Sequence, residues 1–144
     1  MAETQTYQNH VRWYPLAHFV LSPIFLLNII WQLVRLIQDF NIDRVGNLVL
    51  AVAFFLLLIA ARNQALAAQN RIIRLEEALR YQRVLSPDLA FQAEQLPTSS
   101  KIALRFAPDE ELSELVQKAI NGEFAGPKEI KLAIKNWRGD YLRV

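Results

Sequence analysis

Cysteine is absent from the 144 residues of this chain. Its absence excludes disulfide bonds, thiolate metal sites and cysteine nucleophiles. Glycine is scarce, with four residues, and the sequence contains no glycine-rich phosphate-binding loop and no nucleophile motif. The formal net charge of +2 is too small to indicate nucleic-acid binding by itself. The sequence therefore predicts no catalytic residue, no cofactor, no metal ligand and no nucleic-acid partner.

Hydrophobic sequence is what the chain has in excess, at 53% of residues, and nearly all of the excess precedes Arg62. Two apolar segments, about 16–37 and 45–61, are each near the length that crosses a hydrocarbon core of about 30 Å. The short polar sequence QDFNIDRVGN joins them and brings them side by side in opposite directions. We therefore expect an N-terminal tail and a transmembrane hairpin within residues 1–61.

The second apolar segment runs on into charged sequence without a glycine or proline to end the helix. We expect a helical arm over 62–84 and a small helical domain over 85–144, so the predicted fold class is all-α. Helix-start and helix-stop residues predict helices over 87–96 and 109–120, and a last helix from Pro127 to Trp137. The segment KIALRF alternates apolar and polar residues, so a strand is also possible there.

Arginines are placed unevenly around the two apolar segments. Arg12 precedes the first segment, and five arginines follow the second within 62–83. In the connecting loop Arg44 is offset by Asp39 and Asp43. The positive-inside rule therefore predicts that both termini lie in the cytoplasm.

The first segment carries polar side chains on one helical face: Asn28, Gln32 and Arg35. Such a face favours packing against another helix over contact with lipid, although it could also line an ion path in an oligomer. Asp39, four residues after Arg35, is expected to pair with it. His10 and His18 are spaced wrongly for two metal or haem ligands on one helix face, so we expect them to form interfacial hydrogen bonds.

The arm carries an apolar seam with the alternating three- and four-residue spacing of coiled-coil contact positions. Its residues are Ala65, Ala68, Ile72, Leu75 and Leu79. The seam is too apolar to remain in water and too short to hold a dimer alone. We expect cover from the apolar faces of 112–120 and 130–137 of the same chain. The alternative is the arm of a second copy.

Two charged groups have a plain and a functional interpretation. The last helix carries a basic stripe of Lys128, Lys131, Lys135 and Arg138. An ordinary solvated face is the simpler interpretation, contact with anionic lipid is the alternative, and DNA binding is not expected. Glu76 and Glu77 stand beside arginines on a helix, which favours ion pairs over acid–base chemistry.

Three blocks of the chain are similar to a known family: RIIRLEEALR, ALRFAPDEEL and KEIKLAIKNWRGDYLRV. The family is a bacterial one of small two-span membrane proteins, catalogued only as a domain of unknown function. The resemblance covers roughly the whole chain and implies two spans in a bacterial inner membrane. It implies no activity and assigns a role to no residue.

These observations predict a non-enzymatic integral membrane protein that acts as an anchoring, scaffolding or accessory subunit of a larger bacterial membrane complex. Its expected partners are membrane lipid and either another protein or further copies of itself. The alternative hypothesis is a membrane-bound regulatory or sensory protein that acts through its C-terminal cytoplasmic domain.

Overall fold

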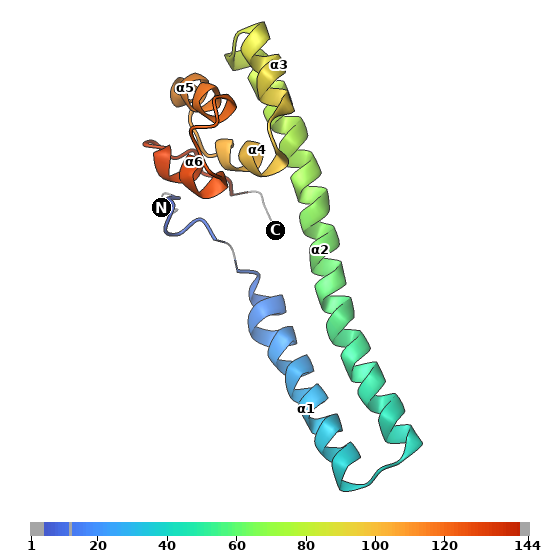
Figure 1. Cartoon of the computed structure of the whole chain (residues 1–144). Helices are drawn as coiled ribbons and strands as arrows, with labels where there is room; N and C mark the ends of the chain where they lie inside the picture. Colours follow the sequence, from blue (N-terminus) through green and yellow to red (C-terminus); the bar gives the residue numbers. More distant parts are fainter. Residues whose placement is uncertain (1–4, 12, 142–144) are drawn as a thin grey trace. The chain divides into compact units, whose positions relative to one another are not determined.

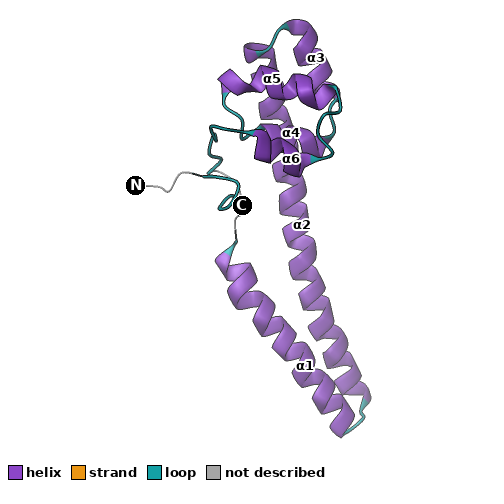
Figure 2. Ribbon diagram, turned by 60° about the vertical axis from the view of Figure 1, so that its left-hand side comes forward, coloured by secondary structure: helices purple, strands orange, loops and turns teal. Residues whose placement is uncertain are grey.

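The computed structural model describes residues 5–11 and 13–141, and within them every regular element is a helix, joined by loops and turns (Figures 1 and 2). The all-α prediction is confirmed. The elements are η1 (Leu16–Leu21), α1 (Ser22–Gln38), α2 (Ile42–Val84), α3 (Pro87–Gln95), α4 (Thr98–Leu104), α5 (Asp109–Ile120) and α6 (Pro127–Ala133). Two compact units result. One is formed by 13–66, and the other by 5–11 together with 67–141.

The first predicted span is one helical stretch, Leu16–Gln38, that begins as a π-helix. Pro23 lacks a backbone donor and its ring crowds the preceding turn, so the chain widens into π-helical spacing before it. Ser22 lies at the junction. Both its backbone N–H and its hydroxyl, the latter at 2.7 Å, donate to the carbonyl of Ala17.

Arg44 closes the connection between α1 and α2. Its guanidinium pairs with the Asp39 carboxylate at 2.7 Å, and donates to the carbonyls of Arg35 at 2.7 Å and Asp39 at 2.9 Å. The predicted Arg35–Asp39 pair is therefore wrong. The last carbonyls of a helix have no partner inside the helix and carry partial negative charge. Arg44 reaches both these carbonyls and the carboxylate.

Both helices of the hairpin are long and apolar enough to cross a membrane. Of the most apolar 18 residues of each, 0% are buried in Leu16–Gln38 and 6% in α2, whereas the core helix of a soluble protein would be mostly buried. Phe25 and Phe54 stack with ring centroids 6.2 Å apart. On the predicted polar face, Gln32 donates to Asn28 at 3.3 Å and both are half-buried. Arg35 is exposed instead.

The second unit has a compact core between the last turns of α2 and helices α3 to α6 (Figure 1). Tyr81 of α2 is fully buried, as are Leu104 at the end of α4 and Phe106 just after it. On α5 the predicted apolar stripe is confirmed, with Leu112 and Val116 at 0% exposure. Apolar residues on one side of each short helix thus determine which side faces the core.

Residues 98–104 form the helix α4, so the possible strand in KIALRF is not formed. A lone strand would leave its buried backbone groups without partners, whereas a helix satisfies them internally. The helical turn also brings Ala103 and Leu104 together into the core at 0% exposure. The polar sequence before it supplies the first turn of this helix from Thr98.

The last helix is shorter than predicted, because α6 ends at Ala133. The Glu111 carboxylate on α5 accepts hydrogen bonds from the backbone N–H groups of Lys135 at 2.9 Å and Asn136 at 3.0 Å. Burial alone would raise the pKa of Glu111, but these bonds outweigh it and hold the pKa below its ordinary value. The N–H groups of Lys135 and Asn136 are thus bonded to Glu111, whereas in a longer α6 they would donate to carbonyls of the helix itself.

We predict that Tyr81→Phe stabilises the protein. The Tyr81 hydroxyl is buried and has no hydrogen-bond partner among the described residues. A buried, unpaired polar group costs about 1–3 kcal/mol, so its removal should raise the free energy of unfolding by about 1 kcal/mol. Urea unfolding of the full chain in detergent micelles, followed by Trp137 fluorescence with Trp13 and Trp31 replaced by Phe, measures it. Tyr14→Phe, at an exposed ring, is the control. A clear loss of stability in Tyr81→Phe would contradict the prediction.

Candidate functional site

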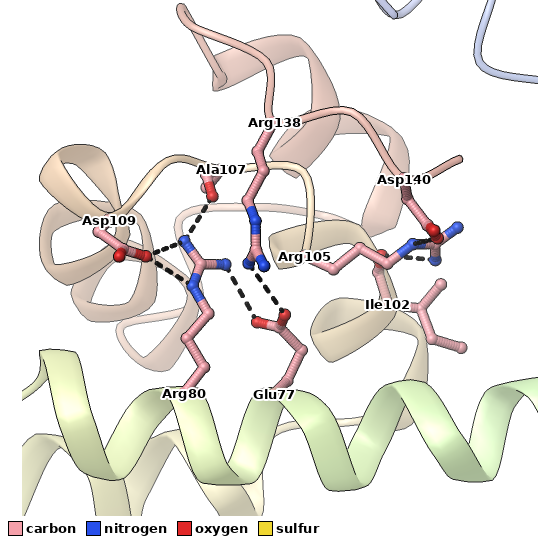
Figure 3. A network of polar contacts seen from close by, with 8 residues as sticks. All are labelled: Glu77, Arg80, Ile102, Arg105, Ala107, Asp109, Arg138 and Asp140. Atoms are coloured by element: carbon pink, nitrogen blue, oxygen red, sulfur yellow. Dashed lines mark hydrogen bonds and ion pairs between the residues drawn. The ribbon is translucent and has the colours of Figure 1, made fainter. Parts of the chain in front are cut away.

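The most unusual feature of the second unit is a charged cluster between α2 and the α4–α5 connection (Figure 3). We call it the buried ion network, and its members are Glu77, Arg80, Asp109 and Arg138. Arg80 is its centre, with a side chain only 3% exposed. Its guanidinium donates to Asp109 Oδ1 at 2.7 Å, to the carbonyl of Ala107 at 2.6 Å and to Glu77 Oε2 at 3.3 Å. One residue of α2 thereby fixes the α4–α5 connection and the first turn of α5.

Glu77 is the deepest carboxylate of the network, with a side chain 5% exposed. Burial raises its pKa above the ordinary value of 4.5, and the nearby charges of Arg80, Arg138 and Arg105 only partly offset this. The arginines thus stabilise the ionised form less than burial disfavours it. Arg138 approaches Glu77 Oε1 at 3.9 Å, and its own backbone N–H is held by the Phe106 carbonyl at 2.8 Å.

A second ion pair lies beside the network (Figure 3). Arg105 donates to Asp140 Oδ2 at 2.9 Å and to the carbonyl of Ile102 at 2.9 Å, and its guanidinium lies 4.2 Å from the centroid of the Phe106 ring. Asp140 also holds the start of the chain, because its backbone N–H donates to the Gln5 side chain at 2.8 Å. The pair therefore joins the two ends of the described chain to the middle of the domain.

An open groove of about 850 Å³ runs along these residues. Its charged lining residues are Arg80, Arg83, Arg105, Arg138, Glu76, Glu77 and Asp140. Most of the arginines are already bonded to carboxylates or carbonyls, which leaves little positive charge to hold an anion. Among residues 5–11 and 13–141, no group of three or more His, Cys, Asp or Glu side chains could hold a metal ion. The arrangement is suited to holding helices together, and it contains no nucleophile with an adjacent base.

The predicted basic stripe does not lie on one helix. Lys128 and Lys131 lie on α6, whereas Lys135 and Arg138 follow its end. Arg138 joins the buried ion network, and Lys131 lies 5.7 Å from the Phe106 ring centroid. The stripe depends on a helix reaching Trp137, and Glu111 prevents that extension.

His10 lies inside the second unit. Its Nδ1 is 2.6 Å from the Tyr7 carbonyl and its Nε2 is 3.1 Å from Lys131 Nζ, so the ring donates to the first and accepts from the second. The ring also contacts Phe106 and Trp137. His18 belongs to the hairpin, where its Nδ1 lies 2.9 Å from the Tyr14 carbonyl. The two histidines therefore belong to different units.

The intramolecular cover predicted for the arm seam is not present. Ile72, Leu75 and Leu79 are 58%, 64% and 54% exposed, and Ala65 and Ala68 are also exposed. The domain packs on another face of α2, which buries Ile73 and Tyr81 with Glu77 and Arg80 between them. The periodic apolar pattern was therefore real, but it did not mark the surface that the domain uses.

Sequence reasoning missed the ion network because it treated Glu77 and Arg80 as an exposed pair. The one available signal is their position: Ile73, Glu77 and Tyr81 recur every four residues, with Arg80 on the same side. The burial of Lys101 was not predicted either. It is 8% exposed and donates to the Glu94 carbonyl at 2.8 Å, and burial lowers its pKa ahead of a smaller effect of Arg74.

Comparison with known proteins relates the chain to a family. The sequence pattern described as Family of unknown function (DUF6526) matches residues 1–144. No curated protein matches the chain. No solved structure matches it either.

We predict that the two partners of the buried pair differ in their effect on stability. Arg80→Met leaves Glu77 buried without its main counter-charge and should cost about 3–5 kcal/mol. Glu77→Gln keeps an acceptor for Arg80 and removes the charge that burial disfavours, so it should cost under about 1 kcal/mol. Urea unfolding of both variants at neutral pH measures this. Equal losses would show that the Glu77 charge is favourable where it lies.

Glu77→Gln also tests how the stability of the protein depends on pH. Folding raises the pKa of Glu77, so protonation of this carboxyl stabilises the folded state. This contribution to the free energy of unfolding is fully present below pH 4.5 and is lost as the pH rises through the higher folded pKa. In Glu77→Gln that loss should disappear, so the difference in stability between wild type and variant should change across this window. A constant difference from pH 4 to pH 8 would contradict the assignment.

Proposed function

Because the chain belongs to the Family of unknown function (DUF6526) over its whole length, we propose a function for it from its structure. We propose that it is a non-enzymatic integral membrane protein. It anchors a small helical domain at the cytoplasmic face of a bacterial inner membrane and serves as a scaffolding or accessory subunit there.

One observation carries this proposal: a single helix belongs to both the apolar hairpin and the domain. α2 supplies the apolar residues that the chain leaves uncovered, and its last turns supply Ile73, Glu77, Arg80 and Tyr81 to the interior of the domain. No linker separates the two parts. An enzyme or a soluble binding module tethered to a membrane needs no such sharing, whereas a structural anchor benefits from it.

The orientation follows from two features. Residues 5–11 fold with 67–141, through contacts such as Gln5 with Asp140. This supports termini on the same side. The positive-inside rule then favours the cytoplasm, because Arg62, Arg71 and Arg74 follow the second span while Arg44 in the loop is paired with Asp39.

The proposed partners are membrane lipid and a protein partner, either another subunit or a second copy. The uncovered apolar helices support the first and the exposed arm seam supports the second. Within the described part of the domain nothing favours nucleic acid, since the basic residues there are dispersed over several elements and in part bonded to carboxylates.

A regulatory role is the second candidate, and the groove beside the buried ion network favours it. At about 850 Å³ the groove is large enough for a small ligand or a peptide segment. Arg83 lines it, is exposed and has no ion pair within the described part of the chain. A sensory domain would use such a surface.

We predict that topology reporters fused at Asn41 and at the C-terminus report opposite sides, with the C-terminus cytoplasmic. The physical reason is the excess of arginine that follows the second span. The chain should also resist alkaline carbonate extraction, because two spans are embedded in lipid. A cytoplasmic signal from Asn41 would contradict the orientation, and release by carbonate would contradict the membrane anchor.

We further predict that purification in mild detergent retains a membrane-embedded partner in constant stoichiometry, identified by mass spectrometry. Arg83→Ala should leave that partner bound, because an anchoring subunit binds through its apolar surfaces. Retention of only a soluble partner that Arg83→Ala releases would favour the regulatory role instead. A matched control is Arg62→Ala, which removes an arginine outside the groove.

A further inference from the structure

We propose that two copies of this chain associate in parallel through the α2 seam, the exposed line formed by Ala65, Ala68, Ile72, Leu75 and Leu79. The three large side chains of the seam are each more than half exposed. At 3.6 residues per turn the seam lies roughly 140° around α2 from the face that packs into the domain. The domain therefore leaves the seam accessible along this part of the helix.

The spacing of the seam assigns coiled-coil positions to its neighbours. Ala65, Ile72 and Leu79 take position a, and Ala68 and Leu75 take position d. On this register Arg71 occupies a g position and Glu76 the following e position. Large apolar residues therefore lie in the seam between an arginine on one edge and a glutamate on the other.

These edge charges select a second copy as the occupant. In a parallel pair, the g residue of one helix meets the next e residue of the other, so Arg71 faces Glu76 of the second copy, and two-fold symmetry repeats the contact. Neither residue has an ion pair within the described part of the chain. The remaining flanking positions bring Gln64 near Gln69 and Ala78 near Arg83, so no like charges oppose each other.

Lipid is a poorer occupant, because Arg71 and Glu76 flank the seam and would be drawn into hydrocarbon with it. An antiparallel pair is also poorer, because it places g beside g and e beside e. The parallel orientation rests on the proposed membrane anchoring, which inserts both copies the same way. Confinement in one membrane also raises the effective concentration of a seam too short to dimerise in free solution.

Disulfide crosslinking in native membranes tests the contact, since the chain contains no cysteine. Ile72→Cys, Leu75→Cys and Leu79→Cys, made singly and oxidised, should form dimers several-fold more efficiently than Ala67→Cys and Arg74→Cys. The two controls are exposed on the same helix outside the seam. Equal crosslinking at seam and control positions would overturn the proposal.

Charge exchange tests the register. In the Leu75→Cys background, Arg71→Glu places two carboxylates opposite each other and should lower the crosslinked fraction by a factor of about two to five. Adding Glu76→Arg to the same chain restores opposite charges and should restore the crosslinking. Both substitutions lie on the surface, and Trp137 fluorescence checks that the domain remains folded. The crosslinked fraction could stay the same in both variants, or it could fall in the single variant and not recover in the double one. Either result would mean that the seam faces lipid or a different protein.

Carbonate extraction of the same membranes separates this inference from the proposed function. If the chain is released, the membrane anchor is wrong whatever the crosslinking shows. If the chain stays embedded and the seam cysteines do not crosslink preferentially, only the inference about a second copy is wrong.

Discussion

Burial of the Arg80 guanidinium is the constraint on which the domain depends. A charge removed from water must be met on every side, and here its partners come from three places in the chain: Glu77 on α2, Ala107 in the α4–α5 connection and Asp109 at the start of α5. Apolar contacts alone would allow short helices to slide over one another. A planar guanidinium with fixed donor directions does not, so Arg80 specifies where α5 begins relative to α2.

The two faces of α2 have different roles. One face of the helix carries Ile73, Glu77, Arg80 and Tyr81 into the domain, and the seam lies largely opposite. A helix that serves two surfaces cannot be apolar all round without being buried all round. Charged residues on the domain face and apolar residues on the outer face reverse the usual arrangement, which is why the more apolar face was predicted to be the one covered.

Much of the fold could be predicted from the sequence. The bounds of the first apolar helix, the α5 stripe and the start of α3 at Pro87 depend on short-range rules, such as periodicity and the fixed φ of proline, and these agree with the structure. What failed depends on contacts between a helix and a residue outside it. The Glu111 carboxylate ends α6 from 24 residues away, and Arg44 takes Asp39 from Arg35 because the loop brings it to the end of α1. The ion network could not be derived, since burial of a charge is visible only once its partners are placed.

The participation of residues 5–11 in the domain has a consequence for how the protein is made. Gln5 and Asp140 are 135 residues apart, yet they bond to each other. During synthesis residues 5–11 leave the ribosome before 67–141 and have no domain to join until the short helices have followed. If the two apolar helices cross a membrane, as proposed, closure of the domain is a late step that requires the two ends of the described chain to meet on one side of that membrane. A chain inserted with one span instead of two would keep them apart, so completion of the domain would report correct insertion.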